Sequence, residues 1–189
     1  MKSLSLRFKL TMVGVMAVLL PILAIGGFSI FKSSDALEEM AQSQSLEVAR
    51  GLAHMTNLTL QEELKIVAQT AQRDVVIDAA AEYQGGSKEG ARLAKATAEL
   101  TAMTQKSGTD YESIFIAGLD GKIIADGHGG KYLNKGIDVS ERDYVKEAKA
   151  GKANIGSVIT SKATGNIVMT LGAPVYSKSN QVIGVVGIT

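Results

Sequence analysis

The hydrophobic residues of this chain follow three successive patterns, and each pattern predicts a different kind of element. From 10 to 31 the sequence is an uncharged, mostly apolar run. From 34 to 83 apolar residues recur at spacings of three and four, which is the period of an amphipathic helix. After Gly108 the pattern changes to short alternating or continuous apolar segments, which are typical of β-strands.

The first run is long enough to cross a membrane. As a helix, its 22 residues would extend about 33 Å, against a hydrocarbon core of about 30 Å. A cleaved signal peptide is the alternative, but its apolar core is only about 7–15 residues long, and no clear small-x-small cleavage site follows here. Lys2, Arg7 and Lys9 precede the run and only Lys32 follows closely. By the positive-inside rule we expect residues 1–9 in the cytoplasm, a transmembrane helix over 10–31 in the inner (cell) membrane, and residues 32–189 outside.

The second pattern predicts one long helix over 34–83, because this segment has no proline, a single glycine and many good helix formers. One apolar stripe along it consists of Leu46, Ala49, Ala53, Thr56, Leu60, Leu64, Val67 and Ala71. A second row consists of Leu37, Met40, Val48, Leu52 and Met55. Both rows of apolar residues can pack on the chain's own domain, and we expect this for the second half of the helix. For the first half we expect a seam with a second copy of the chain in a homodimer. Gly85 and Gly86 end this helix, and 88–106 forms a shorter one.

The third pattern predicts a sheet over residues 111–188. Its strands are expected at 111–117, 122–125, 154–161, 166–176 and 181–188. Asp120 and Gly121 form a tight-turn signal between the first two strands, and Pro174 suggests a bulge or a sheet edge in the fourth. The glycine-rich loop 126–136 and a short helix over 141–150, with Ser140 as its cap, are inserted between strands two and three. The fold class is therefore α+β: a transmembrane helix, a long helix and a five-stranded antiparallel sheet with a loop-helix insertion.

Composition and charge exclude several functions. Twenty Lys and Arg against 19 Asp and Glu leave a net charge of +1, too little for a nucleic-acid partner. The absence of cysteine excludes disulfides, thiolate metal sites and cysteine nucleophiles. Asp126 and His128 are too few ligands for a metal site, and His54 is expected on the surface. The glycine-rich loop lacks the residue spacing of a phosphate-binding loop. We therefore expect no metal and no cofactor. No nucleophile, base and oxyanion constellation is recognisable, so we expect no enzyme.

The start of the inserted helix carries the most informative polar residues. Arg142 offers a planar fork of donors suited to a carboxylate, and Tyr144 adds a hydroxyl and an aromatic wall beside a helix N-terminus, which favours anions. The alternative is that Arg142 pairs with Asp138 or Glu141 on the surface. Spacing alone does not decide between these two interpretations.

A resemblance favours the first. The order of basic tail, single span, long helix and antiparallel sheet, with Asp-Val-Ser-Glu-Arg-Asp-Tyr at 138–144, Ser-Val-Ile-Thr-Ser-Lys-Ala-Thr-Gly at 157–165 and Val-Ile-Gly-Val-Val-Gly at 182–187, resembles a Cache domain. Cache domains are extracytoplasmic PAS-like sensors, most familiar in bacterial methyl-accepting chemotaxis proteins. The resemblance implies a ligand pocket between the sheet and the loop-helix insertion, lined by Arg142, Tyr144, Tyr132 and Asp126, and a signal that leaves through the membrane helices.

The resemblance also suggests a ligand class. In the amino-acid-recognising branch of the family, tryptophan and tyrosine stand two and three residues after the arginine, a tyrosine stands five before it, and a later aspartate binds the ammonium. Here those positions hold Tyr144, Val145, Ile137 and Thr189. We therefore expect a small carboxylate rather than an α-amino acid.

The resemblance leaves the output of such a sensor open. A histidine kinase, a diguanylate cyclase, a membrane-anchored extracytoplasmic enzyme and an adhesive ectodomain are the alternatives to a chemoreceptor. Because the sequence ends within a strand, we also expect it to be a fragment of a longer protein.

Overall fold

A computed structural model of the chain describes residues 6–189. Residues 1–5 of the expected cytoplasmic segment 1–9 lie outside the described residues. The described chain divides into two compact units, one ending at Thr56 and one beginning at Asn57.

The first unit is the greater part of helix α1 (Leu6–Ala71), which contains Pro21 and runs through the expected span 10–31 without interruption. The large apolar side chains described between Leu6 and Ile30 are exposed. Within residues 6–189, α1 is the one helix that is long and apolar enough to cross a membrane.

The second unit begins with the last turns of α1. There the expected stripe does pack on the chain's own domain, since Val67 and Ala71 are buried in its core and Leu64 packs against it. The expected single helix over 34–83 is wrong, however. The chain turns at Gln72 and Arg73, and a separate helix α2 follows (Asp74–Gln84). The turn lets α2 bury Val76, Ala79 and Ala80 in the same core.

Helix α3 (Ala91–Ser107) starts three residues later than expected. The reason is a cap supplied by α2. The Glu82 carboxylate accepts the backbone N–H groups of Arg92 and Leu93, both at 3.1 Å. Gly90 precedes the helix, and a side chain there would overlap the Glu82 carboxylate.

The sheet confirms the expected five antiparallel strands, although the first strand begins at Ile114 rather than at residue 111. Its strands are β1 (Ile114–Gly118), β2 (Ile123–Asp126), β3 (Asn154–Thr160), β4 (Ile167–Tyr176) and β5 (Val182–Ile188). They lie in the order β2-β1-β5-β4-β3, and every neighbouring pair is antiparallel. The pairing of β4 with β3 ends at Gly172. Pro174 lies beyond this point and pairs only with β5, so its missing N–H leaves no gap in the hydrogen-bond ladder.

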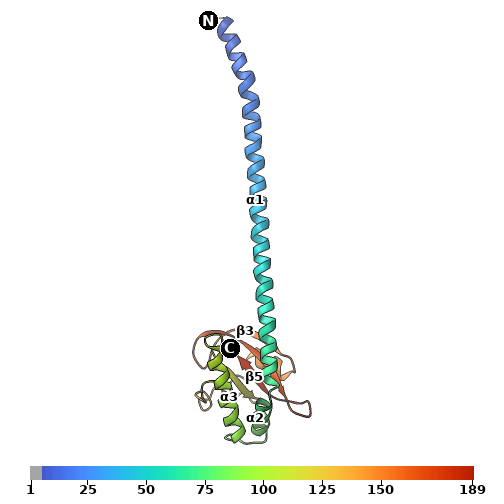
Figure 1. The fold of residues 1–189 in the computed structure, drawn as a ribbon, viewed down its shortest axis with the longest axis vertical. Helices are drawn as coiled ribbons and strands as arrows, with labels where there is room; N and C mark the ends of the chain where they lie inside the picture. Colours follow the sequence, from blue (N-terminus) through green and yellow to red (C-terminus); the bar gives the residue numbers. More distant parts are fainter. Residues whose placement is uncertain (1–5) are drawn as a thin grey trace. The chain divides into compact units, whose positions relative to one another are not determined.

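Both faces of the sheet are covered. Alternate residues of β1 point to opposite sides: Ile114 and Ile116 face the core formed with α1, α2 and α3, whereas Phe115 and Ala117 face a second, smaller core. Figure 1 shows α2 and α3 side by side next to the sheet. Helix α4 (Asp143–Lys149) contributes Tyr144, Val145 and Ala148 to the second core.

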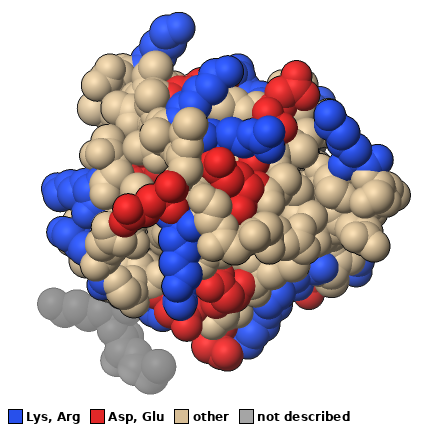
Figure 2. Space-filling view, turned by 90° about the horizontal axis from the view of Figure 1, so that it is seen from below, with Lys and Arg blue, Asp and Glu red and all other residues tan. Residues whose placement is uncertain are grey.

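Charges are mixed on the surface. Figure 2 shows one end of the molecule, where basic and acidic side chains alternate without a continuous basic patch. This agrees with the net charge of +1.

Candidate functional site

A cavity lies on the side of the sheet that carries the second core, between the strands and the inserted loop and helix. Its empty volume is about 550 Å³ including the mouth, and about 50 Å³ of this admits the centre of a water-sized sphere. Since one water needs about 10–15 Å³ on that measure, the space corresponds to about three to five water molecules, which suits a small ligand. All four predicted site residues line it: Asp126, Tyr132, Arg142 and Tyr144.

Helix α4 is shorter than expected, and Ser140 does not cap it. The Ser140 backbone N–H instead donates to the Asp138 carboxylate at 2.8 Å, which forms a local turn and delays the helix to Asp143. The Asp143 carboxylate then accepts the backbone N–H groups of Tyr144 at 2.7 Å and Ser157 at 2.8 Å, and also the Ser157 hydroxyl. These hydrogen bonds from Ser157 lower the pKa of Asp143 and tie α4 to β3.

Glycines in the sheet let α4 lie close to it. A side chain at Gly172 would come within 2.6 Å of the Tyr144 carbonyl oxygen, and one at Gly187 would overlap the Phe115 ring. Gly172 and Gly187 are paired across β4 and β5, so they form one bare patch of sheet. The Phe115 and Tyr144 rings meet edge to face beside this patch, with centroids 6.3 Å apart, and form the apolar floor of the cavity.

Arg142 sits at the start of α4 and is half-buried. One guanidinium nitrogen, Nη2, donates to the Thr160 carbonyl at 2.9 Å. Neither expected surface partner engages it: Asp138 accepts from Ser140, and Glu141 pairs with Lys146 at 3.0 Å. Among residues 6–189 Arg142 has no ion-pair partner, so its remaining donors are available to an anion in the cavity.

Tyr144 supplies the second polar group. Its side chain is buried, and burial raises the pKa of its phenol to about 12; nearby Arg142 opposes this shift and Asp143 adds to it. The hydroxyl is therefore protonated at neutral pH. Within the described chain no hydrogen bond engages it, which leaves it free to donate into the cavity.

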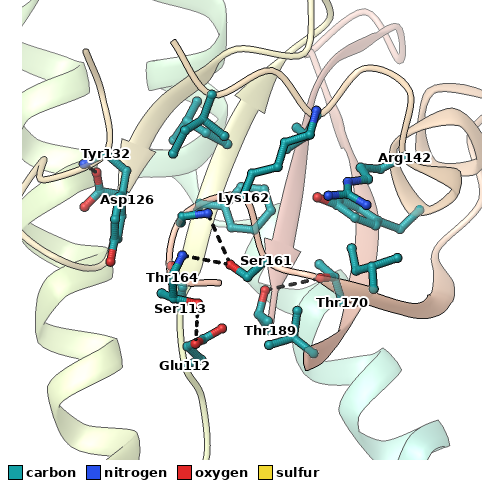
Figure 3. Close-up of a pocket in the computed structure, with 18 residues that line it drawn as sticks. Glu112, Ser113, Asp126, Tyr132, Arg142, Ser161, Lys162, Thr164, Thr170 and Thr189 are labelled. Atoms are coloured by element: carbon teal, nitrogen blue, oxygen red, sulfur yellow. Dashed lines mark hydrogen bonds between the residues drawn. The ribbon is translucent and has the colours of Figure 1, made fainter. Parts of the chain in front are cut away.

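Asp126 and Tyr132 have different roles in the wall. The Asp126 carboxylate is buried and accepts three backbone N–H groups of the glycine-rich loop, those of His128, Gly130 and Tyr132, at 2.8–3.0 Å. It holds the loop in place and has little capacity left for a ligand. Tyr132, the residue that this loop positions, stacks edge to face on His128 with its hydroxyl unpaired among residues 6–189. Figure 3 shows both residues on the side of the cavity away from Arg142.

Several residues that line the cavity were not predicted from the sequence. Lys162 comes from the turn between β3 and β4, where its ammonium donates to the Asp138 carbonyl. Glu112 precedes β1. Thr170 lies within β4 and Thr189 directly follows β5, and their hydroxyl oxygens are 3.3 Å apart. Thr189 has a sequence signal, the position of the missing aspartate, and Lys162 stands in the 157–165 stretch that carries the Cache resemblance, although that stretch predicts no role for it in the cavity. The others carry no local pattern, because strand pairing alone brings them together.

The cavity has a mixed lining. It combines two cationic side chains, the carboxylates of Glu112 and Asp126, several hydroxyls and an apolar floor. No group of three or more metal-ligating side chains occurs in the part of the chain that the structure describes.

Comparisons with known proteins identify the fold. No family model matches the sequence, and no curated protein matches it. Solved structures do match. The sensor domain of the histidine kinase DctB from V. cholerae has a TM-score of 0.62 at 18% identity, covering 82% of this chain and 55% of that one. The sensor domain of DcuS from E. coli has a TM-score of 0.53 at 17% identity, covering 71% of this chain and 90% of that one. This chain thus spans about half the length of the DctB domain, and it has the Cache-type sensor fold that the sequence predicts.

Proposed function

We propose that this chain is the ligand-binding sensor region of a membrane receptor and that it binds a small carboxylate. The observation that carries the proposal is Arg142, a half-buried arginine without an ion-pair partner in the described chain, which lines a small cavity beside the unpaired Tyr144 hydroxyl. Arginine binds carboxylates with two parallel hydrogen bonds, and such charge-assisted bonds are strong where water is excluded.

The rest of the cavity supports this assignment. Lys162 adds a second positive charge, and the Phe115 and Tyr144 rings provide an apolar surface for a short carbon chain. In this proposal Tyr132 contacts the ligand from the loop, whereas Asp126 acts as a positioning residue that holds the loop.

The output of the receptor is a further part of the proposal. The sequence resemblance favours a chemoreceptor, with residues 10–31 as the membrane span, the sensor outside the cell and a homodimer formed through α1. The likeness to the DctB domain supports a histidine kinase as the second candidate. In either receptor the ligand needs only to bind one arrangement of the helices better than another.

The test is calorimetry with the full chain in detergent micelles and with acetate, propionate, lactate and pyruvate as ligands. We expect at least one of these acids to bind, and Arg142→Ala to weaken its affinity about tenfold to 100-fold, since a charge-assisted contact contributes about 1.5–3 kcal/mol. Arg92→Ala is the matched control, because Arg92 is exposed on α3, away from the cavity.

Two results would contradict the proposal. One is an unchanged dissociation constant in Arg142→Ala. The other is tight binding of an α-amino acid by a chain that does not respond to any of the organic acids.

A further inference from the structure

Glu112 is a carboxylate in the cavity wall, and its backbone is held on both sides. Its N–H donates to the Thr189 carbonyl at 2.7 Å, and its own carbonyl accepts from His128 Nε2 at 2.8 Å. The side chain therefore enters the cavity from a fixed point. Figure 3 shows it beside Thr189 and away from Arg142.

The Glu112 side chain is only partly satisfied. Oxygen Oε1 accepts from the Thr164 hydroxyl at 2.7 Å and from the Asn166 amide at 2.5 Å, and both donors are uncharged. Oε2 has no hydrogen bond among residues 6–189, and no cation in that range pairs with the carboxylate. Asp126 differs in this respect, because three backbone N–H groups occupy both of its oxygens.

The charges of the cavity are therefore arranged in two zones. Arg142 and Lys162 can neutralise one carboxylate of a ligand. The Glu112 carboxylate, which has no cationic partner among residues 6–189, lines the other zone together with Ser113, Thr170 and Thr189. Like charges a few ångströms apart repel strongly in a partly dry site. A hydroxyl or an amine in that zone would instead donate a hydrogen bond to the carboxylate.

We infer that Glu112 is a specificity-determining residue, which restricts the ligand to acids with a single carboxylate and rejects acids that carry a second carboxylate at the other end. The inference rests on the proposed function and deepens it, since it defines the charge of the ligand. It also assigns a negative group to the region of Thr189, where the sequence suggested that none remains.

The experiment compares three acids with the same three-carbon chain: propionate, 3-hydroxypropionate and malonate. Their dissociation constants are measured by calorimetry with the full chain in micelles. We expect the wild-type chain to bind the hydroxy acid at least as tightly as propionate, and malonate about tenfold more weakly or worse. In Glu112→Gln the amide keeps the size of the side chain and removes its charge, so malonate should gain about tenfold relative to propionate.

Asn166→Ala is the matched control. It removes a hydrogen bond to Glu112 but leaves the charge, so the ratio of malonate to propionate affinity should stay at the wild-type value. If the ratio shifts equally in both variants, Glu112 acts only by holding the β3–β4 turn, and the inference is overturned.

The remaining outcomes separate this inference from the proposed function. If the acids bind but Glu112→Gln leaves the ratio unchanged, the inference fails and the carboxylate site stands. If the wild-type chain binds malonate more tightly than propionate, the inference fails even without the variant. If no acid binds, both fail.

Discussion

At the scale of single residues, Asp143 supports the site without lining the cavity. Its carboxylate joins the first turn of α4 to Ser157 of β3 and thereby sets the height of Tyr144 above the sheet. The hydrogen bonds from Ser157 lower the pKa of Asp143. The ionised carboxylate is therefore more stable in the native state than in the unfolded state. The stabilisation is therefore present above the ordinary pKa of 3.8 and is lost as the pH falls through the lowered value.

Asp143→Asn should lower the free energy of unfolding by about 1 kcal/mol at about pH 7 and by much less at about pH 3. Denaturant unfolding of the variant and the wild type at the two pH values measures the difference. Glu147→Gln on the same helix, an exposed acid outside this network, should have little effect at either pH. Equal destabilisation by Asp143→Asn at both pH values would contradict the argument.

The residues of the site were only partly predictable. Arg142 and Tyr144 stand in one short segment, so the sequence and its resemblance to a Cache domain can propose them together, and both line the cavity. Glu112 and Lys162 lie fifty positions apart and share no pattern. That both line one cavity depends on β1, β5 and β4 lying side by side, which no local rule contains.

At the scale of elements, the second unit depends on contacts that cross from one helix to the next. The clearest is Glu82 of α2, which caps the backbone of α3 at Arg92 and Leu93. Caps on helix N-termini contribute about 0.5–2 kcal/mol. This cap also fixes where α3 starts on the sheet.

Glu82→Ala should therefore lower the free energy of unfolding by about 1 kcal/mol and the melting temperature by a few degrees. Glu89→Ala removes the same charge from an exposed position in the same connection and should be nearly neutral. Thermal unfolding followed by circular dichroism compares the two. Matching losses in both variants would show that charge, and not the cap, is responsible.

The order of the strands in the sheet depends on long-range pairing. Their positions along the chain do follow from the sequence, because apolar alternation and the Asp120-Gly121 turn are local signals. The division between α1 and α2 does not. The three- and four-residue spacing continues across Gln72 and Arg73, and neither glycine nor proline marks the turn. Only the packing of α2 on the sheet interrupts the helix there.

At the scale of the whole molecule, the membrane and dimer proposals both concern α1. Its residues 34–56 expose large apolar side chains, with Leu46, Val48 and Leu52 each more than half exposed. A helix surface that contacts only water would carry polar side chains at these positions instead. The apolar residues are the ones that the sequence assigns to a seam with a second copy.

We expect the full chain in micelles to be a dimer, and Leu52→Glu to shift it toward the monomer, because a buried charge at a seam is costly. Ser43→Glu places the same charge on the opposite side of the helix and should leave the dimer intact. Chemical crosslinking and light scattering report the change. A monomeric wild-type chain, or equal loss of the dimer in both variants, would contradict the seam.

The buried Asp126 has a consequence for how this domain presents an aromatic wall. Three amide dipoles converge on a single anion, so a glycine-rich stretch keeps a constant path without an apolar interior of its own. In a freely moving linker the Tyr132 ring would occupy many positions relative to the strands. Because the loop backbone is hydrogen-bonded to Asp126, the ring keeps one position. One buried side chain that accepts three backbone hydrogen bonds thus holds this loop in the way that a cluster of leucines holds other segments.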